Sequence, residues 1–373
     1  MAVEEKREEA PIHGDILEAI FSHVPLVDLV PASHVSRAWK RAVSTSLRHV
    51  NPAKPWLTVH TQSARAPHVT NVFAYDPRSR AWFEIHARCA SPALTTALRS
   101  AHSTLLYAIS PREFTFSADP LRLTWHHARP PRVWRTDPVV GMVGAVVVVA
   151  GGACEFEDDP LAVEAYNTES RAWVRCESMP EILKGSTAST WLSVAVAGDK
   201  MHVTEKNSGV TYTFETNTMT WRGPYDLRPD QSVMQCVTGT IRGRLMVAGV
   251  VGEWESVKLW EVKGELGLGL GYWCEEIGAV PKEMVVKLMG EGVGSIEVNW
   301  IGDFVYIQKR TEPEEMVVCE VGSDGRCAWG SVRNVAVNDA TRIGRMVFCG
   351  SNVGLQDLNR AFMKNCRFVE KVM

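Results

Sequence analysis

The chain has 373 residues, of which 45% are hydrophobic and 22% are charged, the balance of an ordinary soluble globular protein. This length exceeds one minimal domain and suits one large domain together with a small one. The formal net charge of −3 at pH 7 gives no electrostatic basis for nucleic-acid binding, which needs a clustered basic surface, so we expect no nucleic-acid partner.

Charge is nevertheless distributed unevenly along the chain. Residues 76–135 contain nine Arg and four acidic residues, a net charge of +5, whereas residues 251–330 contain 7 Lys or Arg and 15 acidic residues, a net charge of −8. If consecutive segments follow one another in space, one side of the protein is basic and the other acidic. That arrangement suits a polarised partner, and it equally suits two solvated surfaces of opposite sign.

Several segments bear on the cellular compartment. The charged run over residues 4–9 is unlike a signal peptide. Residues 139–154 are uncharged for 16 positions, fewer than the roughly 18 of a membrane-spanning helix, and their valines predict two buried strands. The nine cysteines include no close pair, which favours free thiols in a reducing compartment. We therefore expect a cytoplasmic or nuclear protein without a membrane partner.

Residues 12–50, which follow a polar tail over residues 1–11, have the hydrophobic spacing of helices. Asp15 with Glu18 three positions later is typical of a helix N-terminus, and Pro25 would end that first helix. The same spacing places five apolar side chains on one face of this helix: Ile16, Leu17, Ile20, Phe21 and Val24.

Two more short helices are expected in the same segment. Asp28 would cap the second helix, with Pro31 in its first turn, and Ser36 would cap the third. The third helix presents apolar residues at spacings of four: Val35, Trp39, Val43 and Leu47. Three short helices bury little surface by themselves, so such a unit leans on a partner or on a neighbouring domain.

A connector over residues 51–56 leads into a segment, residues 57–373, in which short runs of strand-forming residues alternate with turns. Tryptophan recurs there at intervals of 43 to 56 residues, at Trp82, Trp125, Trp173, Trp221, Trp273 and Trp329. Three of these follow an aromatic residue by seven positions: Tyr75 and Trp82, Tyr166 and Trp173, Phe214 and Trp221. Such a period is typical of kelch-type propeller blades.

The repeat predicts a mainly β fold, a kelch-type propeller of six blades with a seventh from the last forty residues as the alternative. One unit reads as four strands over residues 192–197, 200–204, 210–214 and 219–221. The ring needs closure so that no strand edge stays open, and residues 56–60 and 345–349 are the candidates. We expect each repeated Trp to be a buried plate on an outer strand, with no chemical role.

The N-terminal residues also carry a resemblance to a known family. The pattern runs Ile16-Leu17-x-x-Ile20-Phe21-x-x-Val24-Pro25-Leu26-x-Asp28-Leu29, then Val35-Ser36-Arg37-x-Trp39-Lys40-Arg41. It resembles an F-box, and with the kelch-like repeats the chain resembles the plant F-box/kelch-repeat proteins along essentially its whole length.

This resemblance implies a non-catalytic substrate receptor of an SCF-type cullin–RING ubiquitin ligase, with no cofactor and with a target protein bound by the propeller. Its F-box would dock on the Skp-type adaptor through Leu17, Ile20, Pro25, Leu26, Leu29 and Trp39. Internal packing of the three helices is the alternative role for these side chains. Some plant members direct phenylpropanoid or flavonoid enzymes to degradation, which makes such an enzyme a candidate target.

Four residues outside the repeated positions are candidate contacts with the target. Trp and Arg are enriched at binding hot spots, and an exposed Trp is costly unless something covers it. The candidates are Arg112, Arg129, Trp191 and Trp254. Core packing is the alternative role for Trp191.

No motif predicts catalysis or a metal site. The glycines of Gly267-x-Gly269-x-Gly271 do not open a helix within a βαβ unit, and the adjacent His126 and His127 would point to opposite faces of a strand. Two further functions stay open. One is a kelch interaction scaffold outside any ligase, and the other is a propeller enzyme such as a copper oxidase, which would need clustered Tyr, His and Cys near the axis.

Overall fold

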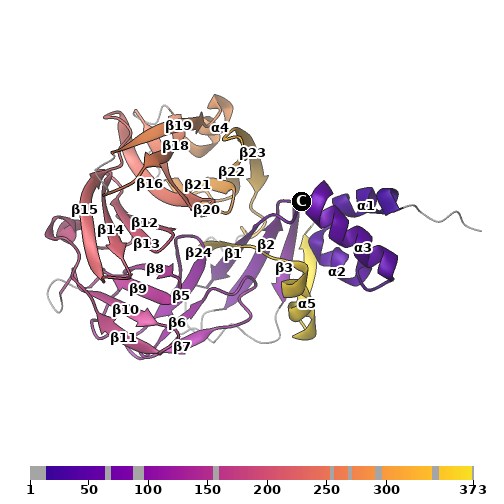
Figure 1. Cartoon of the computed structure of the whole chain (residues 1–373), viewed down its shortest axis with the longest axis horizontal. Helices are drawn as coiled ribbons and strands as arrows, with labels where there is room; N and C mark the ends of the chain where they lie inside the picture. The colour runs from indigo at the N-terminus through magenta and orange to yellow at the C-terminus, as the bar shows by residue number, and fades with distance from the viewer. Residues whose placement is uncertain are drawn as a thin grey trace, which may run out of the picture.

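A computed structural model describes residues 14–63, 69–86, 96–153, 159–252, 256–267, 271–289, 296–337 and 344–371. It consists of a ring of β-sheets with a group of helices at one side (Figure 1). Trp254 lies outside the described residues, so its predicted contact with the target stays a prediction.

The N-terminal helices form where the sequence predicts them. They are α1 (Gly14–His23), α2 (Leu26–Ala32) and α3 (Arg37–Thr45), and a π turn, η1 (Ser46–Val50), extends α3. Ser36 caps α3 as expected, because its hydroxyl accepts a hydrogen bond from the Trp39 N–H at 3.2 Å. The predicted cap of α2 is wrong: the helix already begins after Pro25, so that Asp28 lies in its first turn and Pro31 near its end. We call residues 14–50 the helical unit.

Six antiparallel sheets follow, and each is one blade of the propeller. Blade 1 combines β1 (Trp56–Gln62), β2 (Thr70–Asp76) and β3 (Ala81–His86) with two strands from the C-terminus. Blade 2 consists of β4 (Leu98–Ala101), β5 (Leu105–Ile109), β6 (Phe114–Ser117) and β7 (His126–Ala128). Blade 3 consists of β8 (Val139–Val143), β9 (Val146–Ala150), β10 (Val163–Asn167) and β11 (Ala172–Arg175).

The other three blades have the same order of strands from the axis outward. Blade 4 consists of β12 (Leu192–Ala197), β13 (Lys200–Glu205), β14 (Val210–Glu215) and β15 (Thr220–Asp226). Blade 5 consists of β16 (Val233–Ile241), β17 (Arg244–Val251), β18 (Ser256–Gly264) and β19 (Tyr272–Ala279). Blade 6 consists of β20 (Ile296–Ile301), β21 (Phe304–Lys309), β22 (Glu315–Val321) and β23 (Cys327–Arg333). Short helices η2 (Glu181–Ser186) and α4 (Lys282–Met289) connect strands.

The ring closes by the predicted pair of segments. Strand β24 (Arg345–Ser351) pairs antiparallel with β1, in a register that matches Trp56 with Ser351 and Gln62 with Arg345. Six blades are therefore confirmed. The C-terminal residues build no seventh blade, since they form α5 (Leu355–Met363) and β25 (Arg367–Lys371), which adds to the outer edge of β3.

The repeated tryptophans lie on or beside the outermost strands, but the expectation that each is a buried plate is wrong. Trp82 is buried in the core between blades 1 and 6, and β25 pairs with its strand on the outer side. The other outer strands form the open edges of their sheets, and Trp273 on β19 is 61% exposed. The recurring Trp thus marks a position in the repeat without a constant degree of burial.

Close packing between neighbouring inner strands depends on glycine in places. Gly239 on β16 lies against Trp300 on β20, and a Cβ at Gly239 would lie 2.1 Å from atoms of the indole ring. Such a distance is far below van der Waals contact, so only glycine admits this tryptophan between blades 5 and 6.

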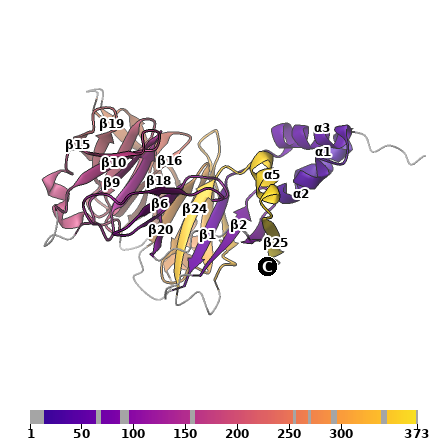
Figure 2. The ribbon, with the colours of Figure 1, turned by 90° about the horizontal axis from the view of Figure 1, so that it is seen from below.

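The helical unit shares a hydrophobic core with blade 1 and α5. Leu26 and Leu29 of α2 are buried in one cluster with Trp56, Phe83 and Leu358. The expectation that these helices lean on a neighbouring domain is confirmed, and Figure 2 shows them beside α5 at one end of the ring.

A polar clasp from the β2–β3 turn reinforces this joint. The Arg78 guanidinium donates to the carbonyl oxygens of Asn51 at 2.9 Å and of Phe21 at 2.6 Å, and it also donates to Val24. Asp76 accepts from the Leu26 N–H at 3.4 Å. The Asp-Pro turn of the first repeat therefore binds the end of α1 and the start of α2.

Candidate binding surfaces

The helical unit leaves apolar side chains uncovered on one face of α1. Ile16 is 54% exposed and Ile20 is 46% exposed, and their spacing of four places them one turn apart on the same face. Val35 and Val50 are exposed as well. Single exposed apolar residues are common on protein surfaces, whereas neighbouring ones typically mark a contact surface.

The six residues predicted to contact the adaptor fall into two groups. Leu17, Leu26 and Leu29 are buried inside the chain, where they take part in the core shared with the propeller. Pro25 and Trp39 are half-buried, and the Trp39 ring meets Phe21 edge-on at 5.3 Å. Of the six, Ile20 is the most accessible in this structure. Periodicity places Ile16 on the apolar helix face but does not mark it as a contact, because it shows which residues share a face and not which face stays uncovered.

The second candidate surface is the axial channel of the propeller. The inner strands of the six blades are β24, β4, β8, β12, β16 and β20, and all run in the same direction along the axis. A cavity of about 1290 Å³ occupies the channel. Most of the residues that line it lie at the end where these strands begin, and they include residues of the β13–β14 and β21–β22 turns. We call this end the mouth.

The mouth lies at the opposite end of blade 1 from the helical unit. Strand β1 begins at Trp56, in the core shared with the helices, and ends at Gln62, which pairs with Arg345 at the mouth. Seven residues of strand at about 3.3 Å each separate the two ends by roughly 20 Å. The helical unit and the mouth can therefore engage different partners at once.

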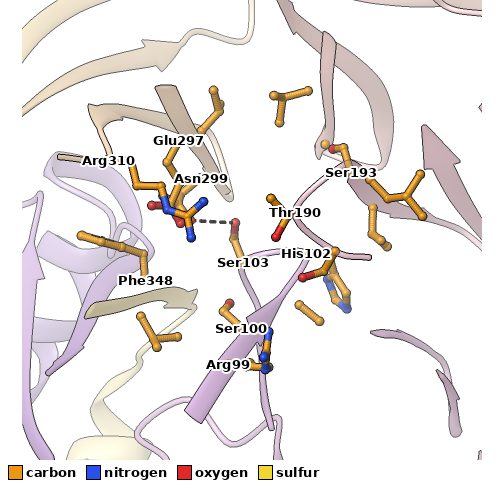
Figure 3. Close-up of a pocket in the computed structure, with 18 of the residues that line it drawn as sticks. Arg99, Ser100, His102, Ser103, Thr190, Ser193, Glu297, Asn299, Arg310 and Phe348 are labelled. Carbon is orange, nitrogen blue, oxygen red and sulfur yellow. Dashed lines mark hydrogen bonds between the residues drawn. The ribbon is translucent and has the colours of Figure 1, made fainter. Parts of the chain in front are cut away.

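Four cationic side chains from four blades line the mouth: Arg99, Lys206, Arg310 and Arg345. Arg99 forms an ion pair with Asp137. Within the described part of the chain, the other three have no carboxylate at ion-pair distance. Lys206 donates to the Thr190 carbonyl at 2.9 Å, and Arg345 to the Leu98 carbonyl at 3.4 Å. Figure 3 shows Arg310 extending into the cavity.

These cations repel one another. Burial is the main reason why the pKa of Arg345 lies below its usual value, and the positive charges of Arg99 and Arg310 lower it further. Burial also lowers the pKa of Lys206, an effect that Glu297 opposes and Arg310 reinforces. Asp137 opposes both shifts, so nearby carboxylates offset part of the repulsion among these cations.

Most carboxylates of the mouth already have partners. Asp137 accepts from Arg99, from the Ser189 hydroxyl at 2.7 Å and from the Thr190 hydroxyl at 3.1 Å. Glu312 forms an ion pair with Lys309 at 2.7 Å, and Glu314 also takes part in an interaction. Glu297 accepts from the Gln308 amide at 3.1 Å.

The wall of the channel is polar, with hydroxyl and amide side chains on the inner strands (Figure 3). Asn299 and Gln308 are buried, yet the Asn299 Nδ2 donor and the Gln308 Oε1 acceptor have no partner among the described residues. Ser100 likewise has a hydroxyl without a partner there. Buried polar atoms normally have partners, so these three groups are suited to hydrogen bonding with a bound molecule or with water.

An apolar rim adjoins the mouth. Trp191 lines the cavity and is 50% exposed, and Met234 at the start of β16 is 59% exposed. Backbone hydrogen bonds connect the two segments through Lys206, whose N–H donates to the Trp191 carbonyl and whose carbonyl accepts from Cys236. Trp191 therefore does not serve as a core residue, which was the alternative role considered for it.

The predicted arginines lie farther out. Arg112, in the β5–β6 turn, and Arg129, just after β7, are exposed at the same end of blade 2 as the mouth, but neither lines the cavity. No sequence pattern indicates Arg99, Arg310 and Arg345, because they come from three blades and meet only when the ring closes.

Among the described residues, no group of three or more His, Cys, Asp or Glu is placed to hold a metal ion. Six of the described cysteines have free thiols: Cys176, Cys236, Cys274, Cys319, Cys327 and Cys349. No described helix has the length and apolar character needed to cross a membrane.

Comparisons with known proteins agree with this architecture. The F-box-like family model matches residues 15–49. An F-box/kelch-repeat protein of Arabidopsis thaliana is 43% identical over 380 residues, which cover 97% of this chain and 95% of that protein.

The solved structures that match include two of putative 6-phosphogluconolactonases. That of Bacteroides fragilis NCTC 9343 has a TM-score of 0.43 at 12% identity and covers 76% of this chain and 83% of its own. That of Bacteroides uniformis ATCC 8492 has a TM-score of 0.41 at 11% identity and covers 75% and 83%. At these values the likeness carries no conclusion about this chain.

Proposed function

This chain belongs to the F-box/kelch-repeat proteins, and from that membership we propose that it is the substrate receptor of an SCF-type ubiquitin ligase. Its F-box would bind a Skp-type adaptor while its propeller binds a target protein, and the chain itself would catalyse no step. Its contribution would be positioning: tethering raises the effective concentration of target lysines near the ubiquitin-charged enzyme to about the millimolar range.

The observation that carries the proposal is the F-box-like match over residues 15–49 of this chain, together with an F-box/kelch-repeat relative of matching length. The structure adds two supports. The exposed pair Ile16 and Ile20 offers an apolar surface on α1. The clasp made by Arg78 joins the F-box to the propeller, so a bound target would be held in one orientation relative to the adaptor.

We propose that the adaptor contact centres on Ile16 and Ile20, with Pro25 and Trp39 contributing at its border. Leu17, Leu26 and Leu29 would support this surface from beneath, since they are buried. A polar substitution of Leu26 is therefore a poor test, because it would place a charge in the shared core and unfold the joint.

Affinity pull-down of a Skp-type adaptor by the full chain tests the proposal. The double variant Ile16→Asp/Ile20→Asp should lower adaptor binding at least tenfold while the thermal midpoint of the propeller stays unchanged. Ile182→Asp, which changes an equally exposed isoleucine on η2, is the matched control and should bind normally. Wild-type binding by the Ile16/Ile20 variant would refute this contact surface, and absence of adaptor binding by the unaltered chain would refute the receptor role.

A phenylpropanoid or flavonoid enzyme remains the candidate target, and the cytoplasm or nucleus the expected compartment. An interaction scaffold outside any ligase is the alternative function. Adaptor binding separates the two, because a scaffold has no need of it.

A further inference from the structure

We infer that the mouth of the channel binds an anionic peptide segment of the target, whose carboxylates pair with Arg310 and Arg345. This inference rests on the proposed receptor role for the identity of the ligand as a protein. The binding chemistry itself follows from the cavity, and it can be tested separately.

The size and lining of the cavity favour a peptide. Its volume of about 1290 Å³ exceeds the roughly 300–1,000 Å³ of typical small-molecule pockets. Such pockets are predominantly apolar, whereas this channel is lined by hydroxyls and amides, with unpartnered groups on Asn299 and Gln308. Main-chain amides and carbonyls of an inserted loop would supply partners for these groups.

The charged side chains of the cavity indicate that its ligand carries a negative charge. Arg310 and Arg345 lie in one cavity without a carboxylate partner among the described residues, although Asp137 and Glu312 are paired with other cations. Guanidinium groups bind carboxylates through paired, charge-assisted hydrogen bonds. An incoming carboxylate would relieve the repulsion between the two arginines, and a cationic segment would increase it.

Glu297 has the opposite charge to the two arginines, so substitutions at the mouth can either strengthen or weaken the binding of an anion. Its carboxylate lines the same cavity and accepts only from the Gln308 amide among the contacts that the structure describes. It would therefore repel an anionic ligand. Removing this charge should strengthen binding, while removing an arginine charge should weaken it.

The apolar rim indicates what accompanies the anionic residues. Trp191 and Met234 are exposed beside the mouth, and an aromatic plate next to a cationic pocket suits a peptide with an apolar residue near its acidic ones. The apolar rim and the cationic mouth both lie at the end of the propeller that faces away from the F-box, so the target and the adaptor would not compete for one surface.

Fluorescence anisotropy with the full chain, measured with and without a Skp-type adaptor, provides the test. The probe is a fluorescein-labelled hexaglutamate peptide, with hexaglutamine as the neutral control. We expect binding of the acidic peptide alone, weakened about tenfold or more by Arg310→Gln or Arg345→Gln. Glu297→Gln should tighten it. A peptide with one leucine beside the glutamates should bind more tightly, and Trp191→Ala should remove that gain.

Arg326→Gln is the control for general loss of positive charge, because Arg326 is exposed in the β22–β23 turn at the opposite end of the ring. It should leave binding unchanged. A phosphoserine peptide and inorganic phosphate serve as further arms: tighter binding of the phosphoserine peptide would identify a phosphorylated segment as the source of the negative charge. Equal binding of hexaglutamine, or equal losses for Arg326→Gln and Arg310→Gln, would overturn the inference.

The outcomes separate this inference from the proposed function. Adaptor binding without acidic-peptide binding would refute the site and leave the receptor role intact. Acidic-peptide binding by a chain that fails to bind the adaptor would support the site and refute the receptor role.

Discussion

Arg78→Met should weaken the docking of the F-box on the propeller without unfolding the propeller. The Arg78 side chain donates to three carbonyls of the helical unit and the connector, at Phe21, Val24 and Asn51. The first two lie at the end of α1, where helical carbonyls lack partners within the helix. Methionine keeps the apolar stem of the side chain and removes the guanidinium.

The magnitude follows from these contacts. A hydrogen bond involving a charged group contributes roughly 1.5–3 kcal/mol. The three bonds come from one side chain and are not additive, and water can reach part of the freed carbonyls. We therefore expect the docking of the helical unit to lose about 2–4 kcal/mol, enough to change its population of open states by at least tenfold.

Hydrogen–deuterium exchange is the direct assay, because local opening is read segment by segment. Exchange should accelerate in α1 and α2, while β13, β17 and β21 keep wild-type protection. Arg80→Met is the matched control: Arg80 lies in the same turn, is exposed and has no hydrogen bond among the described residues. Unchanged exchange in α1 and α2 of Arg78→Met, or the same acceleration in Arg80→Met, would refute the clasp.

Two further predictions concern stability. Burial lowers the pKa of His102 from 6.5 to about 4, so the folded protein keeps this ring neutral while the unfolded chain binds a proton below pH 6.5. The free energy of unfolding therefore falls as pH decreases from 6.5 toward 4, by about 2 kcal/mol for this histidine between pH 7 and pH 5. His102→Asn should make the stability measured by urea unfolding depend less on pH. Asn is chosen because it tolerates the positive φ of 37° at this position. An unchanged slope would contradict the assigned neutral state. Gly239→Ala should lower the free energy of unfolding by about 1–3 kcal/mol or more, because the added methyl group would overlap Trp300 and disturb the packing of blade 5 on blade 6. In a Trp300→Leu background the same change should cost much less, and equal costs in both backgrounds would show that the overlap is not the cause.

Much of the fold could be predicted from the sequence because its signals are local. The alternation of strand and turn residues over 192–221 gave the four strands of blade 4 within a few residues. The candidate closing segments were found because a ring requires an inner strand for its first sheet, and β24 supplies it. The cap of α2 was placed wrongly because Asp28 and Pro25 are both acceptable at a helix start, and propensity alone does not choose between them.

The candidate sites could be predicted only in part. The apolar periodicity of α1 identified Ile20, but it could not say that Leu17 turns inward to the propeller core and Ile16 outward. Trp191 was identified because it lies outside the repeat positions, where a loop at one face of the ring was expected to begin. Arg310 and Arg345 carry no such mark, since arginine at the end of a strand is common on any surface.

The amino-acid sequence by itself determined the helical start, the six-fold repeat and the family, because each of these depends on residues close together along the chain. Only the tertiary structure decided which apolar face of α1 stays uncovered and which charges meet at the axis. Ring closure brings residues 99, 206, 310 and 345 into one cavity, and no local pattern records contacts among residues that lie 35 to 246 positions apart in the chain.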